Sequence, residues 1–229
     1  MRAIHKTQGH EPPELADFKA AANEDWTPTY GKLTSVEKDV IRKALLAEQG
    51  FLCCYCGSRI GETKDDCHIE HLLTQKDRKD LALDYGNMLG SCQPAPRPGA
   101  PRPVPEQCGH KRGTAKLEVT PLQPDCEAFF AYRSSGEILP ADDTDRAGPA
   151  ERTIKALALH VDKLRAARAA AIGAALDGLE GLSDEEALRA LAMYESPDAT
   201  GRLFPFCFAI SAVLRQYVPD GSPQGSTAP

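Results

Sequence analysis

The chain carries four motifs in close succession: CCYCG (residues 53–57), HIEH (68–71), YGNMLGSC (85–92) and CGHKRG (108–113). Two cysteine pairs in these motifs, the first with C-x2-C spacing, bracket a Glu-His pair and an asparagine. Zinc favours four thiolate or imidazole ligands in tetrahedral geometry, whereas carboxylate oxygens suit harder cations. The stretch therefore predicts a zinc-stapled frame around a second, harder metal site, which indicates a nuclease.

The predicted ligands of the structural zinc ion are Cys53, Cys56, Cys92 and Cys108. The loop between the second pair is longer than usual, but loop length costs little entropy once a metal closes the loop. The alternative is that several of these cysteines are merely small buried hydrophobic residues, which is common for free cysteine. The other four cysteines comprise two that lie near enough to compete as ligands, Cys54 and Cys67, and two expected in the core, Cys126 and Cys207.

Composition describes an ordinary globular protein, with 229 residues, 26% charged and 41% hydrophobic. The first residues lack an apolar run, so we expect no signal peptide, and no stretch is long and apolar enough to cross a membrane. Eight cysteines without a secretory signal favour a reducing cytoplasm and metal ligation over disulfides. The net charge of -6 excludes a basic field over the whole protein, so nucleic acid would be met by a local patch or with a partner's help.

The segment before the first cysteines contains one clear helix signal. Thr34 and Glu37 fit a capping box, and Gly50 fits the C-terminal stop, so a helix is predicted that ends directly on the CCYCG motif. Residues 1–33 are expected to be irregular, with Trp26 and Tyr30 anchoring them on the core.

Short strands are predicted at CHIEHLL (67–73) and NMLGSC (87–92). Residues 93–105 hold six prolines, which exclude a helix and favour polyproline II. This segment is either a spacer, the reading we favour, or a recognition strip that exposes Arg97 and Arg102.

The C-terminal half is predicted to be a hairpin followed by helices. The hairpin is AFFAYRSSGEILP (128–140), which turns at residues 134–136. Pro149 suits the first turn of a long helix that reaches about Leu176. A second capping box is expected at Ser183–Glu186, where another helix would begin. A buried helix is expected at 204–218, followed by a disordered tail at 219–229.

Glu70 and His71 are the residue types that phosphodiester hydrolysis needs, since a base activates water and a divalent cation takes up negative charge. Adjacent side chains on a regular strand point to opposite faces, so the two can share a site only where the strand twists or ends. Taken alone, His71 would more simply be a buried histidine whose hydrogen bonds serve the fold. The surrounding zinc ligands and Asn87 favour a catalytic role instead. His68 is expected to be a structural neighbour of the site.

The ordered set of motifs resembles the HNH endonucleases, whose core is a ββα-metal fold. More narrowly, the chain is similar to the PtuB nucleases of Septu-type anti-phage defence and of related retron systems. The similarity covers most of residues 1–215 through seven segments: MRAIHK, LAEQGFLCCYCG, HIEHLLTQ, NMLGSC, CGHKRG, RSSGEILPAD and LALHVDKLRAAR.

This resemblance implies a role for each residue of the site. His71 would be the general base, Glu70 a ligand of the catalytic divalent ion, and Asn87 the residue whose amide holds the base-bearing segment. His110 is the candidate for the third position, a second metal ligand, although HNH proteins often place that ligand directly after the last zinc cysteine, where this chain has Gly109. One residue is about 100° around a helix, so His110 faces that site only if Gly109 bends the start. The ion would be Mg²⁺ or Mn²⁺ foremost, with nickel also acceptable.

One local stretch is cationic and could position a nucleic-acid strand through its phosphates without reading its sequence. The alternative is a solvated charged face. Its members are Arg97, Arg102, Lys111, Arg112 and Lys116.

Together these observations predict an α+β protein with four segments: an irregular segment and helix (1–50), a zinc-stapled ββα-metal HNH core (51–117), a hairpin and helical region (118–218) and a tail (219–229). The predicted function is metal-dependent hydrolysis of nucleic-acid phosphodiester bonds, DNA or RNA, in anti-phage defence. The resemblance names an ABC-type or SMC-like ATPase, PtuA, as the expected partner. The alternatives are a non-catalytic zinc-binding module that recognises nucleic acid or protein, and an HNH nuclease of restriction or repair.

Overall fold

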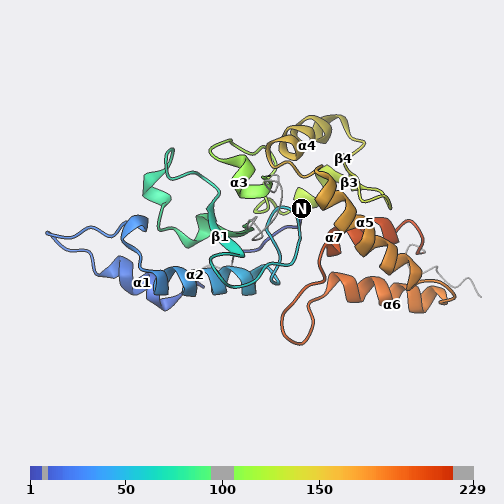
Figure 1. Ribbon diagram of the computed structural model, residues 1–229, viewed down its shortest axis with the longest axis horizontal. Coiled ribbons are helices and arrows are strands. Elements are labelled where there is room, and N and C mark those ends of the chain that lie inside the picture. The colour runs from blue at the N-terminus through green and yellow to red at the C-terminus, as the bar shows by residue number, and fades with distance from the viewer. Residues whose placement is uncertain (7–9, 94–105, 219–229) are drawn as a thin grey trace, which may run out of the picture.

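The computed structural model describes residues 1–6, 10–93 and 106–218 (Figure 1). The polyproline prediction, with Arg97 and Arg102, and the predicted tail lie outside these residues. The described chain is α+β, with seven α-helices and two small antiparallel sheets. The helices are α1 (Pro13–Ala20), α2 (Ser35–Glu48), α3 (Cys108–Arg112), α4 (Thr144–Ala156), α5 (Asp162–Asp177), α6 (Asp184–Glu195) and α7 (Cys207–Leu214). The strands are β1 (Cys67–His71), β2 (Met88–Cys92), β3 (Phe130–Tyr132) and β4 (Ile138–Pro140).

Helix α2 begins and ends as its sequence predicts. The Thr34 side chain accepts a hydrogen bond from the Glu37 amide at 3.4 Å, and the Glu37 carboxylate accepts one from the Thr34 amide at 2.6 Å. Gly50 follows with a left-handed φ of 61°, which turns the chain toward the first cysteines. The capping box thus sets where the helix starts, and the glycine sets where it stops.

The prediction that residues 1–33 are irregular is wrong, because they contain α1. The prolines of EPPEL, which we expected to supply turns, instead occupy the N-terminus of this helix, where their missing amides and fixed φ are tolerated. Leu15 of α1 is fully buried beside Ile41 and Leu45 of α2. Trp26 and Tyr30 are half-buried, as an anchoring role requires.

The sheet of β1 and β2 packs against α2. The strands are antiparallel, with Glu70 opposite Leu89. The Gln49 side chain at the end of α2 donates to the Gly90 carbonyl at 2.9 Å and accepts from the Gly90 amide at 2.7 Å. Gly90 has no side chain to hold the helix away, since a Cβ there would come within 3.3 Å of three neighbouring side chains. The helix therefore fixes the position of the strand pair that carries the Glu-His motif.

The continuous helix predicted from Pro149 to Leu176 is also wrong, because the chain forms α4 and α5 with a break between them. Helix α4 starts earlier, at an N-cap formed by Asp143, and Pro149 lies inside it. At the break Ala158 adopts a left-handed φ of 48°. Two carbonyls at the break accept hydrogen bonds from other helices: Leu157 from the Cys108 amide of α3 at 2.8 Å and Leu159 from the Arg168 side chain of α5 at 2.9 Å. These hydrogen bonds stabilise a break that the local sequence pattern does not indicate.

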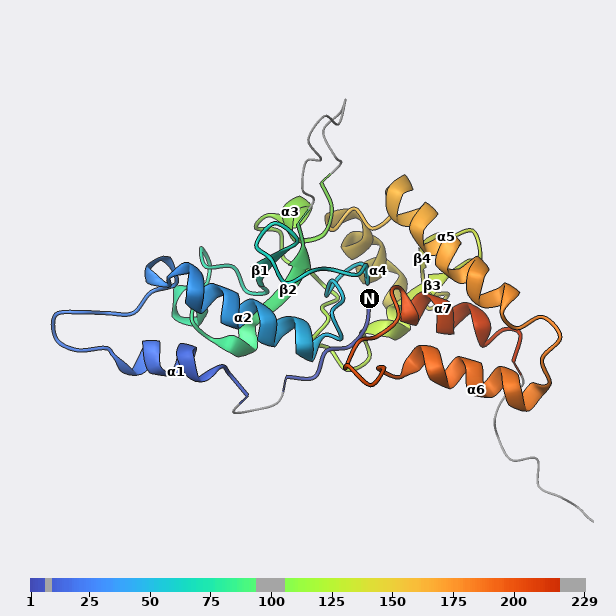
Figure 2. The same ribbon diagram turned by 60° about the horizontal axis from the view of Figure 1, so that its bottom comes forward.

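Three further predictions for the C-terminal half are confirmed: the hairpin, the second capping box and the last buried helix. Strands β3 and β4 form the hairpin, Ser183 and Glu186 make a capping box at the start of α6, and α7 is almost wholly buried. Helices α5, α6 and α7 lie together at the end of the molecule opposite α1 and α2 (Figure 2).

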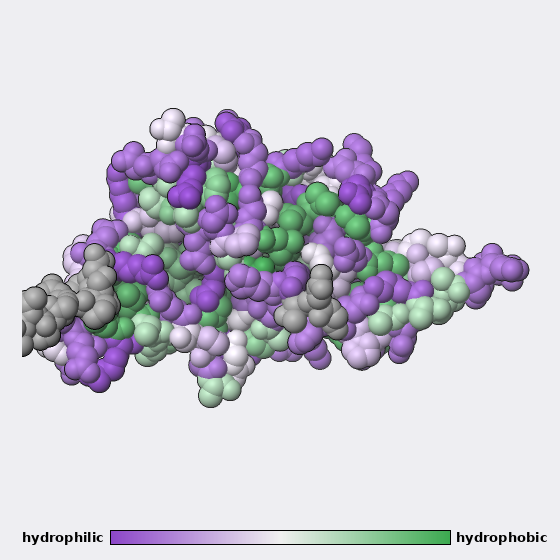
Figure 3. Space-filling view, turned by 180° about the vertical axis from the view of Figure 1, so that it is seen from behind, coloured by the Kyte–Doolittle hydropathy of each residue, from purple (hydrophilic) through white to green (hydrophobic). Residues whose placement is uncertain are grey.

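One buried cluster joins the cysteine frame to the C-terminal helices, since it runs from Leu46 through the four predicted zinc ligands to Leu214. A second, smaller cluster lies between α1, α2 and the strand pair. The surface mixes hydrophilic side chains with separate apolar patches (Figure 3), and single exposed apolar residues such as Val36 and Met193 are ordinary for a protein surface. Within the described residues no helix is long and apolar enough to cross a membrane.

Candidate metal centre and active site

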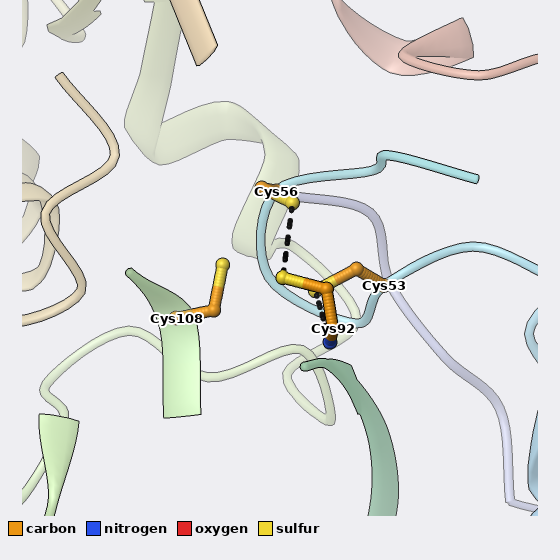
Figure 4. A group of neighbouring side chains, drawn as sticks. All are labelled: Cys53, Cys56, Cys92 and Cys108. Carbon is orange, nitrogen blue, oxygen red and sulfur yellow. Dashed lines mark hydrogen bonds between the residues drawn. The ribbon is translucent and has the colours of Figure 1, made fainter. Parts of the chain in front are cut away.

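The four predicted zinc ligands come together from three separate segments (Figure 4). Cys53 and Cys56 lie in the turn after α2, Cys92 ends β2 and Cys108 begins α3. Their four sulfur atoms lie within 4.8 Å of one another, and those of Cys56 and Cys92 are 4.0 Å apart. A tetrahedral zinc ion with bonds of about 2.3 Å separates its sulfur ligands by about 3.8 Å. The cluster could therefore hold a metal ion such as zinc.

Backbone and side-chain N–H groups support the sulfur atoms. The Cys92 amide donates to Cys53 Sγ at 3.3 Å, and the Gln107 side chain donates to Cys92 Sγ at 3.6 Å. Such donors stabilise thiolates in metal sites. Gly57 closes the turn of the first pair with a φ of 74°, and a Cβ there would meet the Phe208 ring at 2.4 Å. The turn is therefore built for glycine at this position.

The remaining cysteines are buried and lie outside the four-ligand group. This holds for Cys54 and Cys67, which we considered as competing ligands, as well as for Cys126 and Cys207, which the sequence places in the core. Burial raises the pKa of Cys67 to about 12, so its thiol stays protonated at neutral pH. Cys126 is fully buried without a role in the cluster, which makes it a matched control for a ligand cysteine.

Glu70 lies at the centre of a buried polar network. Its Oε1 atom accepts hydrogen bonds from Tyr55 at 3.0 Å and from Arg112, and its Oε2 atom lies 2.8 Å from Nε2 of His68. Burial by itself would raise the pKa of Glu70, but the His68 hydrogen bond and the charge of Arg112 lower it below the usual value. The carboxylate is therefore ionised at neutral pH.

Arg112 is an internal residue, which contradicts its prediction as a phosphate contact. Its side chain is 1% exposed, and besides Glu70 it binds the carbonyls of His71 at 3.1 Å and of Leu72. The sequence could not distinguish it from its neighbour Lys111, because both belong to the same basic run. Lys111 and Lys116 are exposed, as a contact with phosphate requires.

His71, the last residue of β1, is oriented by hydrogen bonds to both ring nitrogens. Its Nε2 lies 3.0 Å from the Ala82 carbonyl, which can only accept, so Nε2 carries the proton. Nδ1 is then the basic nitrogen and lies 3.3 Å from the side-chain nitrogen of Gln75. Burial lowers the pKa of His71 below its usual value, so the ring is neutral at neutral pH. This tautomer suits a general base.

Glu70 and His71 face different neighbours, as the alternation of a regular strand predicts. Glu70 contacts Arg112 of α3, whereas His71 contacts the Tyr30 ring edge-on, with 4.6 Å between ring centres. A cavity of about 580 Å³ adjoins the partners of His71. Its lining includes Tyr30, Gln75 and Ala82 together with two lysines, Lys76 and Lys79.

Asn87 holds the segment that follows His71, as the resemblance implies. Its side-chain oxygen accepts from the Leu73 amide at 2.7 Å, and its nitrogen donates to the carbonyls of Leu73 at 2.9 Å and Leu81 at 3.3 Å. The amide thus closes the loop that carries Gln75 and the Ala82 carbonyl.

We expect Asn87→Ala to destabilise the protein by about 1–3 kcal/mol, because it removes three hydrogen bonds to partly buried backbone groups. Urea unfolding would measure this loss. Asn87→Asp is the informative companion: it keeps the acceptor for Leu73 but sets a carboxylate against the Leu73 and Leu81 carbonyls, so its loss should at least equal that of alanine at neutral pH. An alanine variant as stable as wild type would contradict the clamping role.

His110 lies at the solvent edge of the site. It is exposed, its Nε2 is 2.8 Å from the Gln93 side-chain oxygen, and its ring centre is 4.7 Å from that of His68. Among the described residues the four cysteines are the one group of His, Cys, Asp and Glu whose ligand atoms converge. The structure therefore brings His110 beside His68 without joining it to Glu70 as a ready ligand set.

Three polar side chains contact the site more closely than their sequence context indicates: His68, Tyr55 and Gln75. The signal for His68 was available, because residues two apart on a strand share a face and His68 is two residues before Glu70. Tyr55 and Gln75 lie in irregular segments, where no periodicity indicates direction. A comparison with known protein families and with curated proteins finds no match for this chain.

Proposed function

We propose that this protein is a metal-dependent HNH nuclease that hydrolyses phosphodiester bonds of nucleic acid. The observation that carries the proposal is His71: a neutral, buried histidine whose protonated Nε2 is fixed by a backbone carbonyl, which leaves Nδ1 as the basic nitrogen, directly after an ionised Glu70. A module that only binds zinc and nucleic acid has no need of a fixed histidine tautomer next to a buried carboxylate. The frame of β1, β2 and α3 around the cysteine cluster is compatible with a ββα-metal fold.

In this mechanism His71 Nδ1 accepts a proton from the attacking water. The water oxygen bonds to phosphorus while the bond from phosphorus to the leaving oxygen breaks. Asn87 keeps the loop of Gln75 and Ala82 in place, so the basic nitrogen retains its direction. Because β1 ends at His71, a phosphate at this strand end could meet both residues, and a divalent cation held at Glu70 would supply positive charge to it. Lys76 and Lys79, at the cavity beside His71, offer contacts to neighbouring phosphates.

The order of the motifs favours a place beside the PtuB nucleases of Septu-type and retron-associated defence, acting with an ATPase of the PtuA kind. The acidic net charge supports dependence on a partner for nucleic-acid capture. An HNH nuclease of restriction or repair would use the same site. Co-expression with an adjacent ATPase gene separates these two assignments, since only the defence assignment expects a stable complex on size exclusion.

His71→Ala should lower the rate of nucleic-acid cleavage by about 10²–10⁴-fold, the loss typical of removing a general base. Cleavage of single- and double-stranded DNA and RNA would be measured with Mg²⁺ and with Mn²⁺, with and without the ATPase. His160→Ala is the matched control, because His160 is exposed on the segment between α4 and α5. Zinc content and melting temperature of the His71 variant should stay near wild type. Wild-type rates from a folded His71→Ala protein would refute the proposed mechanism.

A further inference from the structure

This inference rests on the proposed function and concerns Gly109, which stands where HNH proteins often carry a metal ligand. A side chain at this position is incompatible with its surroundings. A Cβ on Gly109 would lie 2.3 Å from Glu70 Oε2, 2.5 Å from His68 Cε1 and 2.7 Å from His68 Nε2. Because Gly109 has no side chain, the His68 ring can approach the Glu70 carboxylate.

His68 is placed to share a ligand with Glu70. The two residues are two apart on β1, so their side chains project from the same face. His68 Nε2 and Glu70 Oε2 are 2.8 Å apart. Two neighbouring ligand atoms on one ion, each at about 2.1 Å, are separated by about 3 Å. The His68 side chain is 26% exposed, so the pair is reachable from solvent.

The rest of the network leaves this pair incomplete. Arg112 and Tyr55 bind Oε1 of Glu70, whereas among the described residues Oε2 is approached by His68 alone. His68 Nδ1 is buried and has no hydrogen-bond partner in the described chain. Nδ1 is the ring nitrogen that does not face Glu70, so it is left to pair with water, as the second nitrogen of a metal-bound histidine can. Arg112 and Tyr55 meanwhile fix the carboxylate in the manner of outer-shell groups at a metal site.

We infer that His68 takes over the ligand position that Gly109 lacks, so that His68 and Glu70 of β1 bind the catalytic cation, with His110 on its outer side. The donor set that β1 supplies is then one imidazole and one carboxylate, with the His110 ring beside that of His68. Imidazole suits first-row transition ions, whereas Mg²⁺ is held by oxygen donors and waters. The site would accordingly prefer Mn²⁺ or a later transition ion over Mg²⁺.

The test is a titration of the zinc-loaded chain with Mn²⁺, in which the electron paramagnetic resonance signal of free Mn²⁺ reports how much of the ion is bound. Mn²⁺ suits this probe because thiolate sites select zinc. His68→Ala should weaken binding at least about tenfold, the loss typical of removing even an outer-shell partner. Gly109→Ala should weaken it similarly, since its methyl group displaces the His68 ring. His160→Ala and Gly173→Ala should bind as wild type, because Gly173 has open space where a Cβ would stand.

His68→Gln guards against a folding defect, since it keeps a polar partner for Glu70; it should lose Mn²⁺ affinity while zinc content and melting temperature are retained. If Glu70→Gln loses Mn²⁺ and both His68 variants bind normally, the role of His68 is refuted while the nuclease proposal stands. If wild type binds no Mn²⁺, or if Mg²⁺ displaces Mn²⁺ at equal concentration, the inferred site or its ion preference is wrong. If Mn²⁺ binding follows His68 but His71→Ala cleaves normally, the metal site stands and the proposed mechanism fails.

Discussion

Cys108→Ser should release the zinc ion and unfold the chain. Structural zinc contributes about 10–16 kcal/mol of apparent binding free energy in small domains, and this becomes folding free energy when the site does not preexist in the unfolded chain. Natural domains have a free energy of unfolding of only about 5–15 kcal/mol, so the binding free energy lost with the ion equals or exceeds their whole stability. We expect soluble yield, zinc content and far-UV signal to fall together, as measured by elemental analysis and circular dichroism.

The arrangement of the cluster explains why the effect should extend beyond the cysteines. The ligands belong to three segments, and the same buried cluster continues through Leu157 to α7. Without the ion, four buried sulfur atoms would face one another with little to hold α3 against β2. Cys126→Ser is the matched control: Cys126 is equally buried but lies outside the ligand group, so its variant should keep full zinc content. A folded, zinc-free Cys108→Ser protein would refute the structural role of the cluster.

The cysteine cluster could be predicted from sequence because its signal is local chemistry. Thiolates in C-x2-C spacing have few other uses in a reducing compartment, and a metal tolerates the long loop before Cys108. The caps at Thr34 and Ser183 were equally predictable, because each is settled by hydrogen bonds within one turn. The structure of each of these elements is determined by a few residues that are adjacent in sequence.

Features that depend on distant residues could not be predicted in this way. The break between α4 and α5 is stabilised by the Cys108 amide and by Arg168, neither of which adjoins it in sequence. Arg112 belongs to a basic run, yet it is buried because Glu70, from another segment, lies opposite. The catalytic assignment remains a prediction from motif order, and the environment of His71 makes it specific enough to test.

Arg112→Met should destabilise the protein by about 3–5 kcal/mol, the usual loss when one partner of a buried ion pair is removed. The side chain binds Glu70, Tyr55 at 3.1 Å and the carbonyls of His71 and Leu72. Methionine therefore removes the cationic partner of a buried carboxylate, which keeps only its hydrogen bonds with Tyr55 and His68. Urea unfolding of the zinc-loaded protein would measure the loss. Arg152→Met is the matched control, since Arg152 and its partner Glu118 are exposed and surface ion pairs contribute little to stability.

The pH dependence of this loss identifies Glu70 as its cause. In wild type the pKa of Glu70 is lowered, so its stabilising contribution is present above the usual carboxyl pKa and is lost only as the pH falls through the lowered value. Without Arg112 the pKa of Glu70 rises in the direction that burial favours, although the His68 hydrogen bond still lowers it, so protonation stabilises the variant as the pH falls. The difference in unfolding free energy between wild type and Arg112→Met should therefore shrink as the pH falls from neutrality toward the usual carboxyl pKa. The double variant Arg112→Met/Glu70→Gln should recover part of the loss because no charge remains buried. A constant difference across this range, with no recovery in the double variant, would show that Arg112 stabilises the fold through its backbone contacts rather than through Glu70.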